Sequence, residues 1–469
     1  MKFLDRTDEL ARLEALRARS AGGLAVLVGR RRIGKTRLLL EWSRRGDGLY
    51  TVADESSPHV QRRYMAQAAA TRFLGFADVE FPDWPSLLSR LADDARRAGW
   101  RGPLILDELP YLAAASPELP SVLQRWIDHD ARTARLVVAV AGSSQRMLQG
   151  LVLAANAPLF GRAHVLLDLG PLDPTHLPAA LGPLSSAGLV EAYAAWGGVP
   201  RYWELAADAE GTTTDRIERL VLDPLGPLHR EPERLLHEEA SPALEARPVL
   251  DAIGMGAHRV SEIAGRLGRP ATSMARPLAR LQGLGLVRRD IPFGESERQS
   301  RRALYRIDDP LVRLWSRVVA PHRAALTSGT RTDRLRILAR HGPGLLAAAW
   351  EDLCRLRVPR LGAASTLGHA GPWGPCSGWW RGAAPEWDLV SESHDGRRLL
   401  LGEAKWHARP LDAATLARAV AELRARPEPT LPDRFARHAR LRALFVPEVA
   451  RGLRAPTDIL LVTVADLCS

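Results

Sequence analysis

Residues 23–36 read GLAVLVGRRRIGKT, and this stretch decides the fold of the first part of the chain. GLAVLV is a continuous apolar run typical of a buried strand, and a helical pattern, RLLLEWSRR, follows at 37–45. Between them, GRRRIGKT at 29–36 has the spacing G-x-x-x-x-G-K-[ST] of the phosphate-binding loop called Walker A. The pattern predicts a strand, a loop that wraps phosphate, and a helix. The alternative is a chance glycine-rich turn.

The residues of this loop have distinct expected roles. Gly29 and Gly34 let backbone N–H groups face phosphate, and the start of the helix adds a favourable partial charge. Lys35 is expected to contact the β- and γ-phosphates of ATP, and the Thr36 hydroxyl is expected to ligate Mg²⁺. The other loop residues contribute to the same cofactor site through their backbone: Arg30, Arg31, Arg32 and Ile33.

Two further apolar runs end in polar residues. The run at 104–107 ends in Asp107, followed by Glu108, which is a Walker B pattern. Asp107 is expected to hold Mg²⁺ through water, and Glu108 is expected to polarise the attacking water. The run in RLVVAVAGSS ends in Ser143 and Ser144, which are candidates for orienting that water or sensing the γ-phosphate. A serine that caps a helix is the alternative for either one.

A strand expected in GLYTVADES at 48–56 lies between the two motifs. With a glutamate after the Walker B aspartate, this order resembles the AAA+ and STAND branch of P-loop ATPases. The archaeal-type ATPases of this kind carry P-L-[FY]-G-R, and PLFGR at 158–162 ends in Arg162. The resemblance implies a finger that senses the γ-phosphate of a neighbouring subunit, and hence a homo-oligomer formed through the ATPase domain. The alternative is a surface arginine that caps a carbonyl.

Composition restricts the class of protein. The chain has 469 residues, of which 46% are hydrophobic and 25% are charged, so a globular protein of two to four domains is expected. No apolar run reaches the ~18–20 residues that span a bilayer. The charged start, MKFLDRTDEL, is not a secretory signal, so a cytoplasmic protein with no membrane partner is expected. The three scattered cysteines suit neither a disulfide framework nor a zinc site.

Charge is unevenly distributed along the chain. Residues 1–210 hold 25 Lys and Arg against 24 Asp and Glu, whereas residues 211–469 hold 40 against 30. This asymmetry predicts salt-sensitive binding of DNA, or of RNA, by residues 211–469. A drift toward arginine is also present, since the only lysines are Lys2, Lys35 and Lys405. Lys35 and Lys405 both lie in motifs where a compact ammonium is hard to replace by a guanidinium.

Residues 245–320 have the pattern of a winged helix-turn-helix. Two basic strand-like stretches, LVRRDI and RRALYRI, follow the helical patterns and flank a wing around 292–300. The helical patterns lie at 245–254, 260–268 and 271–287. The candidates for nucleic-acid contact recur at i, i+4 and i+8 on the third helix: Thr272, Arg276 and Arg280. Pro277 in that helix is expected to kink it. Contact with a protein or with the rest of the chain is the alternative use of the module.

The segment PEWDLVSESHDGRRLLLGEAKW at 385–406 predicts a hairpin with Asp395-Gly396 at its tip. A symmetric hairpin places Asp388 opposite Glu403, and Glu386 opposite Lys405, on one face of the sheet. Asp…Glu-x-Lys after a helix that bears Glu351 resembles the PD-(D/E)XK nuclease core. In that core Asp388, Glu403 and Glu351 would hold Mg²⁺ or Mn²⁺, and Lys405 would orient the attacking water or stabilise the charge of the reacting phosphate. The alternative is a solvated surface hairpin.

The complete arrangement resembles archaeal-type DEXX-box ATPases with a C-terminal domain of this nuclease-like pattern. The fold class expected is α/β, in four parts. They are an ATPase core with a parallel sheet at 1–172, a helical lid and connector at 173–244, the winged helix at 245–320, and an α/β nuclease-like domain at 321–469. The function expected is Mg²⁺-dependent ATP hydrolysis, with DNA binding and cleavage by the C-terminal half. The rivals are a nucleotide-driven switch or scaffold, or a transcription regulator, that binds without cleavage.

Overall fold

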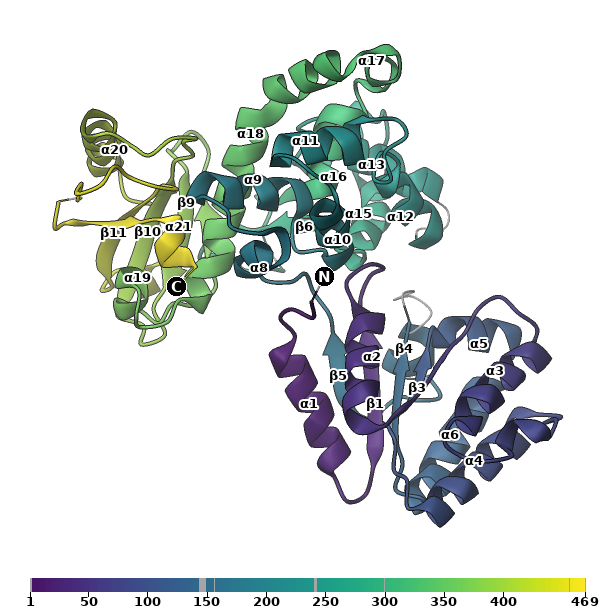
Figure 1. Cartoon of the computed structure of the whole chain (residues 1–469). Helices are drawn as coiled ribbons and strands as arrows, with labels where there is room; N and C mark the ends of the chain where they lie inside the picture. The colour runs from purple at the N-terminus through teal and green to yellow at the C-terminus, as the bar shows by residue number, and fades with distance from the viewer. Residues whose placement is uncertain are drawn as a thin grey trace. The chain divides into compact units, whose positions relative to one another are not determined.

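The computed structural model describes residues 2–142, 149–155, 157–239, 243–298, 300–454 and 456–468. The chain forms two compact units. The N-terminal unit comprises residues 1–172 and 199–201, and the C-terminal unit comprises residues 173–198 and 202–469. Figure 1 draws the N-terminal unit mainly in purple and blue. No helix in the described part of the chain is long and apolar enough to cross a membrane.

A five-stranded parallel sheet organises the N-terminal unit, in the order β2-β3-β4-β1-β5. β4 therefore lies between β1, which leads into the phosphate-binding loop, and β3, which ends at Asp107. The strands are β1 (Gly23–Val28), β2 (Leu49–Val52), β3 (Leu104–Asp107), β4 (Val137–Ala141) and β5 (Ala163–Asp168). The α/β fold with a parallel sheet expected from the sequence is confirmed.

Helices cover both faces of this sheet (Figure 1). Because side chains alternate along a strand, Leu24 and Val26 pack on one face and Ala25 and Leu27 on the other. The first face is covered by α3 (Pro58–Ala70), α4 (Trp84–Ala98) and α6 (Leu119–Trp126), and the second by α1 (Thr7–Ala18) and α2 (Lys35–Gly46). The short helix α5 (Leu109–Ala115) follows β3.

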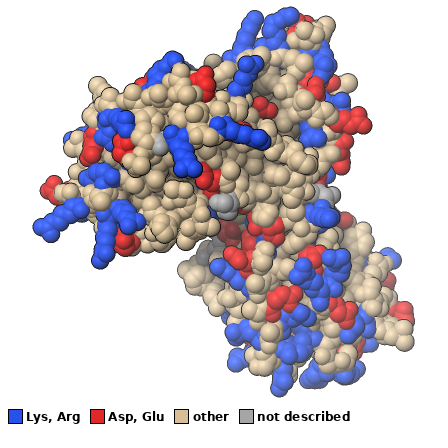
Figure 2. Space-filling model, turned by 60° about the vertical axis from the view of Figure 1, so that its left-hand side comes forward, with Lys and Arg blue, Asp and Glu red and all other residues tan. Residues whose placement is uncertain are grey.

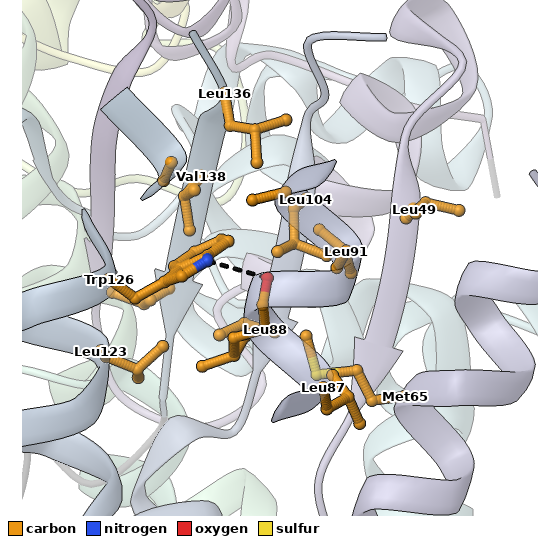
Figure 3. Packing of buried hydrophobic residues seen from close by; sticks show 14 of the residues in the cluster. Leu49, Met65, Leu87, Leu88, Leu91, Leu104, Leu123, Trp126, Leu136 and Val138 are labelled. Carbon is orange, nitrogen blue, oxygen red and sulfur yellow. Dashed lines mark hydrogen bonds between the residues drawn. The ribbon is translucent and has the colours of Figure 1, made fainter. Parts of the chain in front are cut away.

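Figure 3 shows how one of these faces is packed. The Trp126 ring lies among leucines from α4 and valine and leucine side chains of the sheet, and is 3% exposed. Its indole Nε1–H donates to the Leu88 carbonyl oxygen at 2.9 Å, so the buried polar atom of the ring is satisfied. This contact joins α6 to α4 and closes the layer of helices over the sheet.

The C-terminal unit begins with short helices and contains one long helix, α18 (Arg331–Arg357). Thr330 and Asp333 form a capping box at its start. The helix has 27 residues, which correspond to about 40 Å. The shorter helices of this part of the chain are α8 (Leu177–Leu181), α9 (Ser186–Trp196), α10 (Pro200–Asp208), α11 (Thr213–Ile217), α12 (Glu231–Glu239), α16 (Pro310–Leu314) and α17 (Arg323–Ser328).

Three helices and a two-stranded antiparallel sheet share one buried cluster in this unit. They are α13 (Ala243–Gly254), α14 (Val260–Arg266), α15 (Ala275–Gly283), β6 (Val287–Asp290) and β7 (Leu304–Ile307). Met274, Leu278 and Leu281, which recur at i, i+4 and i+7, are buried in it.

The third helix of this group begins later than the sequence pattern indicated. α15 starts at Ala275, so Pro277 lies in its first turn, where the missing N–H costs no helix bond, and the predicted kink is absent. Thr272 lies in the 3-10 turn Ala271–Met274 and is not part of α15.

A mixed five-stranded sheet, in the order β12-β11-β10-β9-β8, ends the chain. Its strands are β8 (Ser377–Trp379), β9 (Trp387–Glu392), β10 (Arg398–Ala404), β11 (Ala439–Phe445) and β12 (Ile459–Val462). The leucines of β10 at 399 and 401 pack against α20 (Ala413–Ala425). The short helices α19 (Thr366–His369) and α21 (Val464–Leu467) complete this part. The antiparallel pair β9–β10 has the predicted register, with Leu401 opposite Val390 and Gly402 opposite Leu389.

The loop between β6 and β7 is seated on this C-terminal sheet. Phe293 N–H donates to the Gly378 carbonyl oxygen at 2.9 Å, and Trp380 Nε1–H donates to the Arg302 carbonyl oxygen at 2.9 Å. The Phe293 ring lies 5.2 Å from that of Phe435, at a tilted angle typical of aromatic pairs. The loop is therefore held by the chain itself at both ends.

Candidate functional site

The backbone of the phosphate-binding loop has positive φ angles at its two glycines. Gly29 and Gly34 have φ of 147° and 95°, which L side chains rarely adopt. A Cβ at Gly29 would lie 2.9 Å from the Leu169 carbonyl oxygen, so no larger residue fits there. Ile33 is 1% exposed and anchors the loop in the core next to α2. The loop therefore stands at the carboxyl end of β1, directly before the N-terminus of α2.

Lys35 is buried, and its ammonium is folded over the loop. Its Nζ donates to the carbonyl oxygens of Gly29 at 2.7 Å and of Arg30 at 3.0 Å. These contacts hold the cation inside the ring of backbone groups that a phosphate chain would enter. Arg31 reaches away from the loop, and its Nη2 donates to the Tyr111 hydroxyl at 2.8 Å.

Asp107 meets the loop from the neighbouring motif. The Thr36 hydroxyl donates to Asp107 Oδ2 at 2.8 Å, so the two residues predicted to serve Mg²⁺ are in contact. Glu108 follows at φ 54°, an uncommon conformation for a residue other than glycine, and its N–H donates to Asp107 Oδ1 at 3.0 Å. A hydroxyl beside a buried carboxylate is an oxygen donor set of the kind that Mg²⁺ takes, so these residues fit the ion.

Tyr50, in β2, belongs to this site and was not predicted. Its hydroxyl donates to Asp107 Oδ2 at 2.9 Å. Burial, followed by the charge of Asp107, raises the pKa of Tyr50 well above its usual range, so the hydroxyl remains a donor. The sequence signal was the strand at 48–56, which pairs with β3 and places Tyr50 opposite Ile105.

The segment 199–201 also belongs to the N-terminal unit. A Cβ at Gly34 would lie 3.4 Å from Pro200 Cγ, so this segment returns to the phosphate-binding loop. Ser143 and Ser144, predicted to sense the nucleotide, lie outside the described residues.

Arg162 lies at the other edge of the sheet. It directly precedes β5, where Ala163 pairs with Leu24 near the amino end of β1, so it cannot reach the phosphate site of its own subunit. Its Nε and Nη2 each donate to a carboxylate oxygen of Asp128 at 2.8 Å, and its Nη1 donates to the carbonyls of Pro158 and Phe160. The alternative role, an arginine that caps carbonyls, therefore describes its contacts within this chain.

The nuclease-like residues lie at one end of the C-terminal sheet. One further step in the observed register pairs Glu403 with Asp388, as the sequence predicts. Asp388 Oδ2 accepts from the Ala404 N–H at 2.9 Å, and Lys405 Nζ lies 3.1 Å from Glu403 Oε1. Glu403 and Lys405 thus share a face, and Asp388 is within reach of both strands.

The negative charge of Asp388 affects the pKa of two other carboxyl groups. Burial, and then the charge of Asp388, raises the pKa of Glu351 to about 7 and that of Glu403 to about 7. Arg355 links the helix to the strand, because its Nε donates to the Asp388 carbonyl at 2.8 Å and its Nη2 lies 3.2 Å from Glu351 Oε2. The charge of Asp388 therefore acts on both Glu351 and Glu403.

The three carboxylates of the predicted metal site do not form one cluster in this structure. In the described ranges, no three His, Cys, Asp or Glu side chains converge closely enough to hold one ion. Glu403 Oε1 is taken by Lys405 and by Arg426, whose Nη2 lies at 2.7 Å. Glu403 is 7% exposed, and its other oxygen, Oε2, is buried without a hydrogen bond. One buried acceptor is therefore available, but the three carboxylates do not meet at one point.

Lys405 and Glu403 also have partners that the sequence did not indicate. Lys405 pairs with Glu422 of α20 at 3.5 Å, in place of the predicted neighbour Glu386. Arg426 follows α20, lies 5.5 Å from the Trp387 ring centre, and donates to the Glu386 carbonyl. Glu422 and Arg426 lie about 20 positions after the hairpin and outside its strands. Counting the strand register therefore could not predict these contacts.

The predicted nucleic-acid residues are at the surface. Thr272 and Arg276 are exposed, and Arg280 is half-buried. The predicted wing, the loop between β6 and β7, is less accessible to nucleic acid than α15, because this loop is hydrogen-bonded to the C-terminal sheet.

Comparisons with known proteins agree with the first part of this description. Residues 3–204 match a family described as an ATPase domain predominantly from Archaea. Among solved structures, the Walker-type ATPase of Pyrococcus abyssi is similar with a TM-score of 0.53 at 19% identity, covering 67% of this chain and 96% of that one. Residues 3–204 are therefore an archaeal-type P-loop ATPase domain.

Two further matches are to proteins without an assigned role. Residues 315–418 match a family described as archaea bacterial proteins of unknown function. The chain is 26% identical over 412 residues to an uncharacterized protein of Methanocaldococcus jannaschii, covering 86% of this chain and 87% of that protein.

Proposed function

We propose that the chain is a Mg²⁺-dependent ATPase that binds DNA through its C-terminal unit and cleaves it. The observation that carries the ATPase part is the 2.8 Å contact between Thr36 and Asp107, which joins the two motifs at one point. Thr36 and Asp107 would hold Mg²⁺, which neutralises charge on the β- and γ-phosphates when bound. The Lys35 ammonium would exchange the loop carbonyls for phosphate oxygens, and Glu108 would orient the attacking water.

The nucleic-acid part of the proposal rests on charge and exposure. The excess of basic residues lies in 211–469, and Arg276 and Thr272 are exposed on and just before α15. We propose that the three helices and the β6–β7 pair act as a winged helix whose α15 contacts the phosphate backbone. The seated wing favours contact through the helix, since the loop between β6 and β7 already has partners in the chain.

The cleavage part rests on Asp388 and Glu403, which lie on adjacent strands, and on Lys405, which directly follows β10. In a PD-(D/E)XK-like site, Asp388, Glu403 and Glu351 would hold Mg²⁺ or Mn²⁺, which activates water and stabilises the leaving oxygen. Glu403 Oε2 is the acceptor available for it. The Lys405 ammonium would stabilise the charge that builds on the phosphate. Arg426 would have to release Glu403 Oε1 for both oxygens to turn toward an ion.

One observation favours the rival, a nucleotide-driven switch or regulator that binds without cleavage. Glu403 is neutralised by Arg426 and Lys405, and such a site is stable without an ion. The experiment incubates the full chain with Mg²⁺ or Mn²⁺, with and without ATP, on single-stranded, duplex and branched DNA and on RNA. Lys405→Ala tests the site, and Lys2→Ala, an exposed lysine, is the matched control.

The cleavage proposal expects products with the wild type and Lys2→Ala and none with Lys405→Ala. Binding that is equal in all three proteins, with no cleavage of any substrate, selects the rival. Cleavage that survives in Lys405→Ala would assign the products to a contaminant and reject the site.

A further inference from the structure

A cavity of about 400 Å³ lies at the edge of the parallel sheet opposite the phosphate-binding loop. It opens among the amino ends of β1, β4 and β5, between residues 21–24, 136–138 and 161–164. The phosphate-binding loop follows the carboxyl end of β1, so the six residues of that strand separate the two places by roughly 20 Å. The cavity is therefore distinct from the nucleotide site, and its volume lies in the range of small-molecule sites.

The lining of the cavity has two chemical parts. The floor is apolar, formed by Leu24, Ala131, Leu136 and Val138, all buried. The rim is cationic and polar, formed by Arg19, Asp128, Arg132, Arg162 and His164. An apolar floor with a few polar groups at its rim is the usual construction of a ligand site.

The charges of the rim are not balanced. Asp128 is the one acidic residue among those that line the cavity, and Arg162 pairs with both of its oxygens at 2.8 Å. Arg132 is exposed and has no hydrogen bond or ion pair within the described part of the chain, although its charge, after the hydrogen bond from Arg162, contributes to lowering the pKa of Asp128. Arg19 is exposed too, with one long contact of 3.4 Å from Nε to the Gly22 carbonyl. Two positive charges are left for a ligand.

His164 adds an oriented donor. The Leu24 N–H donates to its Nδ1 at 3.2 Å, so the neutral ring carries its hydrogen on Nε2. Burial, together with the charge of Arg19, lowers the pKa of His164, which keeps the ring neutral. Gly23 makes this contact possible, because a Cβ there would lie 3.0 Å from Nδ1.

We propose that this cavity binds a small phosphate monoester, with the phosphate on Arg19, Arg132 and His164 Nε2 and an apolar body on the floor. A phosphate monoester carries close to two negative charges at neutral pH, which match the two unpaired arginines. Figure 1 has the loop between α1 and β1 at the lower end of the N-terminal unit, and Figure 2 shows blue side chains crowded at that end. Such a positive surface attracts anions before they dock. The proposal does not depend on the proposed function.

The test is calorimetric titration of phenyl phosphate into the full chain in a Lys35→Ala background, which disables the other phosphate site. Arg19→Gln/Arg132→Gln removes both charges and is expected to weaken binding by about tenfold or more. Arg19→Lys/Arg132→Lys keeps the charges and should lie between that variant and its parent. The matched control, Arg12→Gln/Arg63→Gln, removes two other exposed arginines of the same unit and should bind within about twofold of the parent.

Three outcomes overturn the proposal: no binding of phenyl phosphate, equal binding in Arg19→Gln/Arg132→Gln, or equal loss in the control. Inorganic phosphate and phenol should each bind more weakly than phenyl phosphate. Inorganic phosphate that binds as tightly would reject the role of the apolar floor. A 5′-phosphorylated oligonucleotide that competes better than its 5′-hydroxyl form would make a nucleic-acid end the source of the phosphate and reject a free small molecule.

Discussion

Asp352 is the residue whose replacement should destabilise the C-terminal unit most. It is 8% exposed, and its Oδ1 accepts from Arg288 Nη2 at 2.6 Å while its Oδ2 accepts from Arg313. Burial alone would raise the pKa of Asp352, but the guanidinium groups of Arg288 and Arg313 hold it well below its usual range. The carboxylate therefore stays charged and paired, and it joins α18 to β6 and α16.

Asp352→Asn removes one side of this buried ion pair and leaves two guanidinium groups beside a neutral amide. Removal of one partner of a buried pair costs about 3–5 kcal/mol in the free energy of unfolding. For a unit of this size, that corresponds to a fall in Tm of roughly 5–15 °C. Asp333→Asn, a half-buried aspartate in the capping box of the same helix, is the control and should cost about 1 kcal/mol or less.

The assay is thermal and urea unfolding of the full chain, followed by circular dichroism, at pH 7. An Asp352→Asn protein that unfolds within about 1 kcal/mol of the wild type would refute the argument, because the pair would then contribute no more than a surface contact. The pKa of Asp352 is depressed in the folded state, so its contribution is present above the unfolded pKa of about 3.9 and disappears as the pH falls through the lower folded value. The gap between wild type and variant should therefore close in acid.

Other predictions concern the two candidate sites. Lys35→Ala should abolish ATP hydrolysis, and Glu108→Gln should keep ATP binding but stop turnover; unchanged phosphate release in either, beside the exposed control Glu118→Gln, would contradict the P-loop assignment. Arg276→Gln/Arg280→Gln should weaken binding of duplex DNA at ~50 mM salt and lower the salt dependence, measured by fluorescence anisotropy, whereas Arg219→Gln/Arg234→Gln should not; equal loss in both pairs would reject α15 as the contact. Glu351 has a folded pKa raised to about 7, so its favourable contribution is present below about pH 4.3 and is lost as the pH rises through 7. Glu351→Gln should therefore be more stable than the wild type at pH 8 by about 3 kcal/mol without metal, with no advantage near pH 4, and an advantage that did not depend on pH would exclude this cause.

The sequence predicted those features whose physical cause is local. The phosphate-binding loop needs positive φ at Gly29 and Gly34, and that requirement is visible as glycine. The Asp395-Gly396 turn sets the register of β9 and β10, so the pairing that leads to Asp388 and Glu403 followed from counting residues.

Contacts between distant segments could not be predicted in this way. Arg426 and Glu422 reach the nuclease-like residues from α20 and the loop after it, and Tyr50 reaches Asp107 through the order of the strands. Pro277 illustrates a different limit, since periodicity located the helix but not its first residue. The metal set of Asp388, Glu403 and Glu351 stays a prediction, and Arg426, which holds Glu403 Oε1, is a contact that neither spacing nor register contains.

The contacts between the β6–β7 loop and the C-terminal sheet have a consequence for synthesis on the ribosome. Phe293 donates to Gly378, 85 positions later, and its ring stacks near Phe435, further still. A ribosome adds about 5–20 residues per second, so roughly 4–17 s pass between the synthesis of Phe293 and that of its hydrogen-bond partner Gly378. During that interval the aromatic ring is in water, without the sheet that later covers it. Slow codons between these positions would lengthen the exposure, and the nascent chain would be most prone to aggregate there.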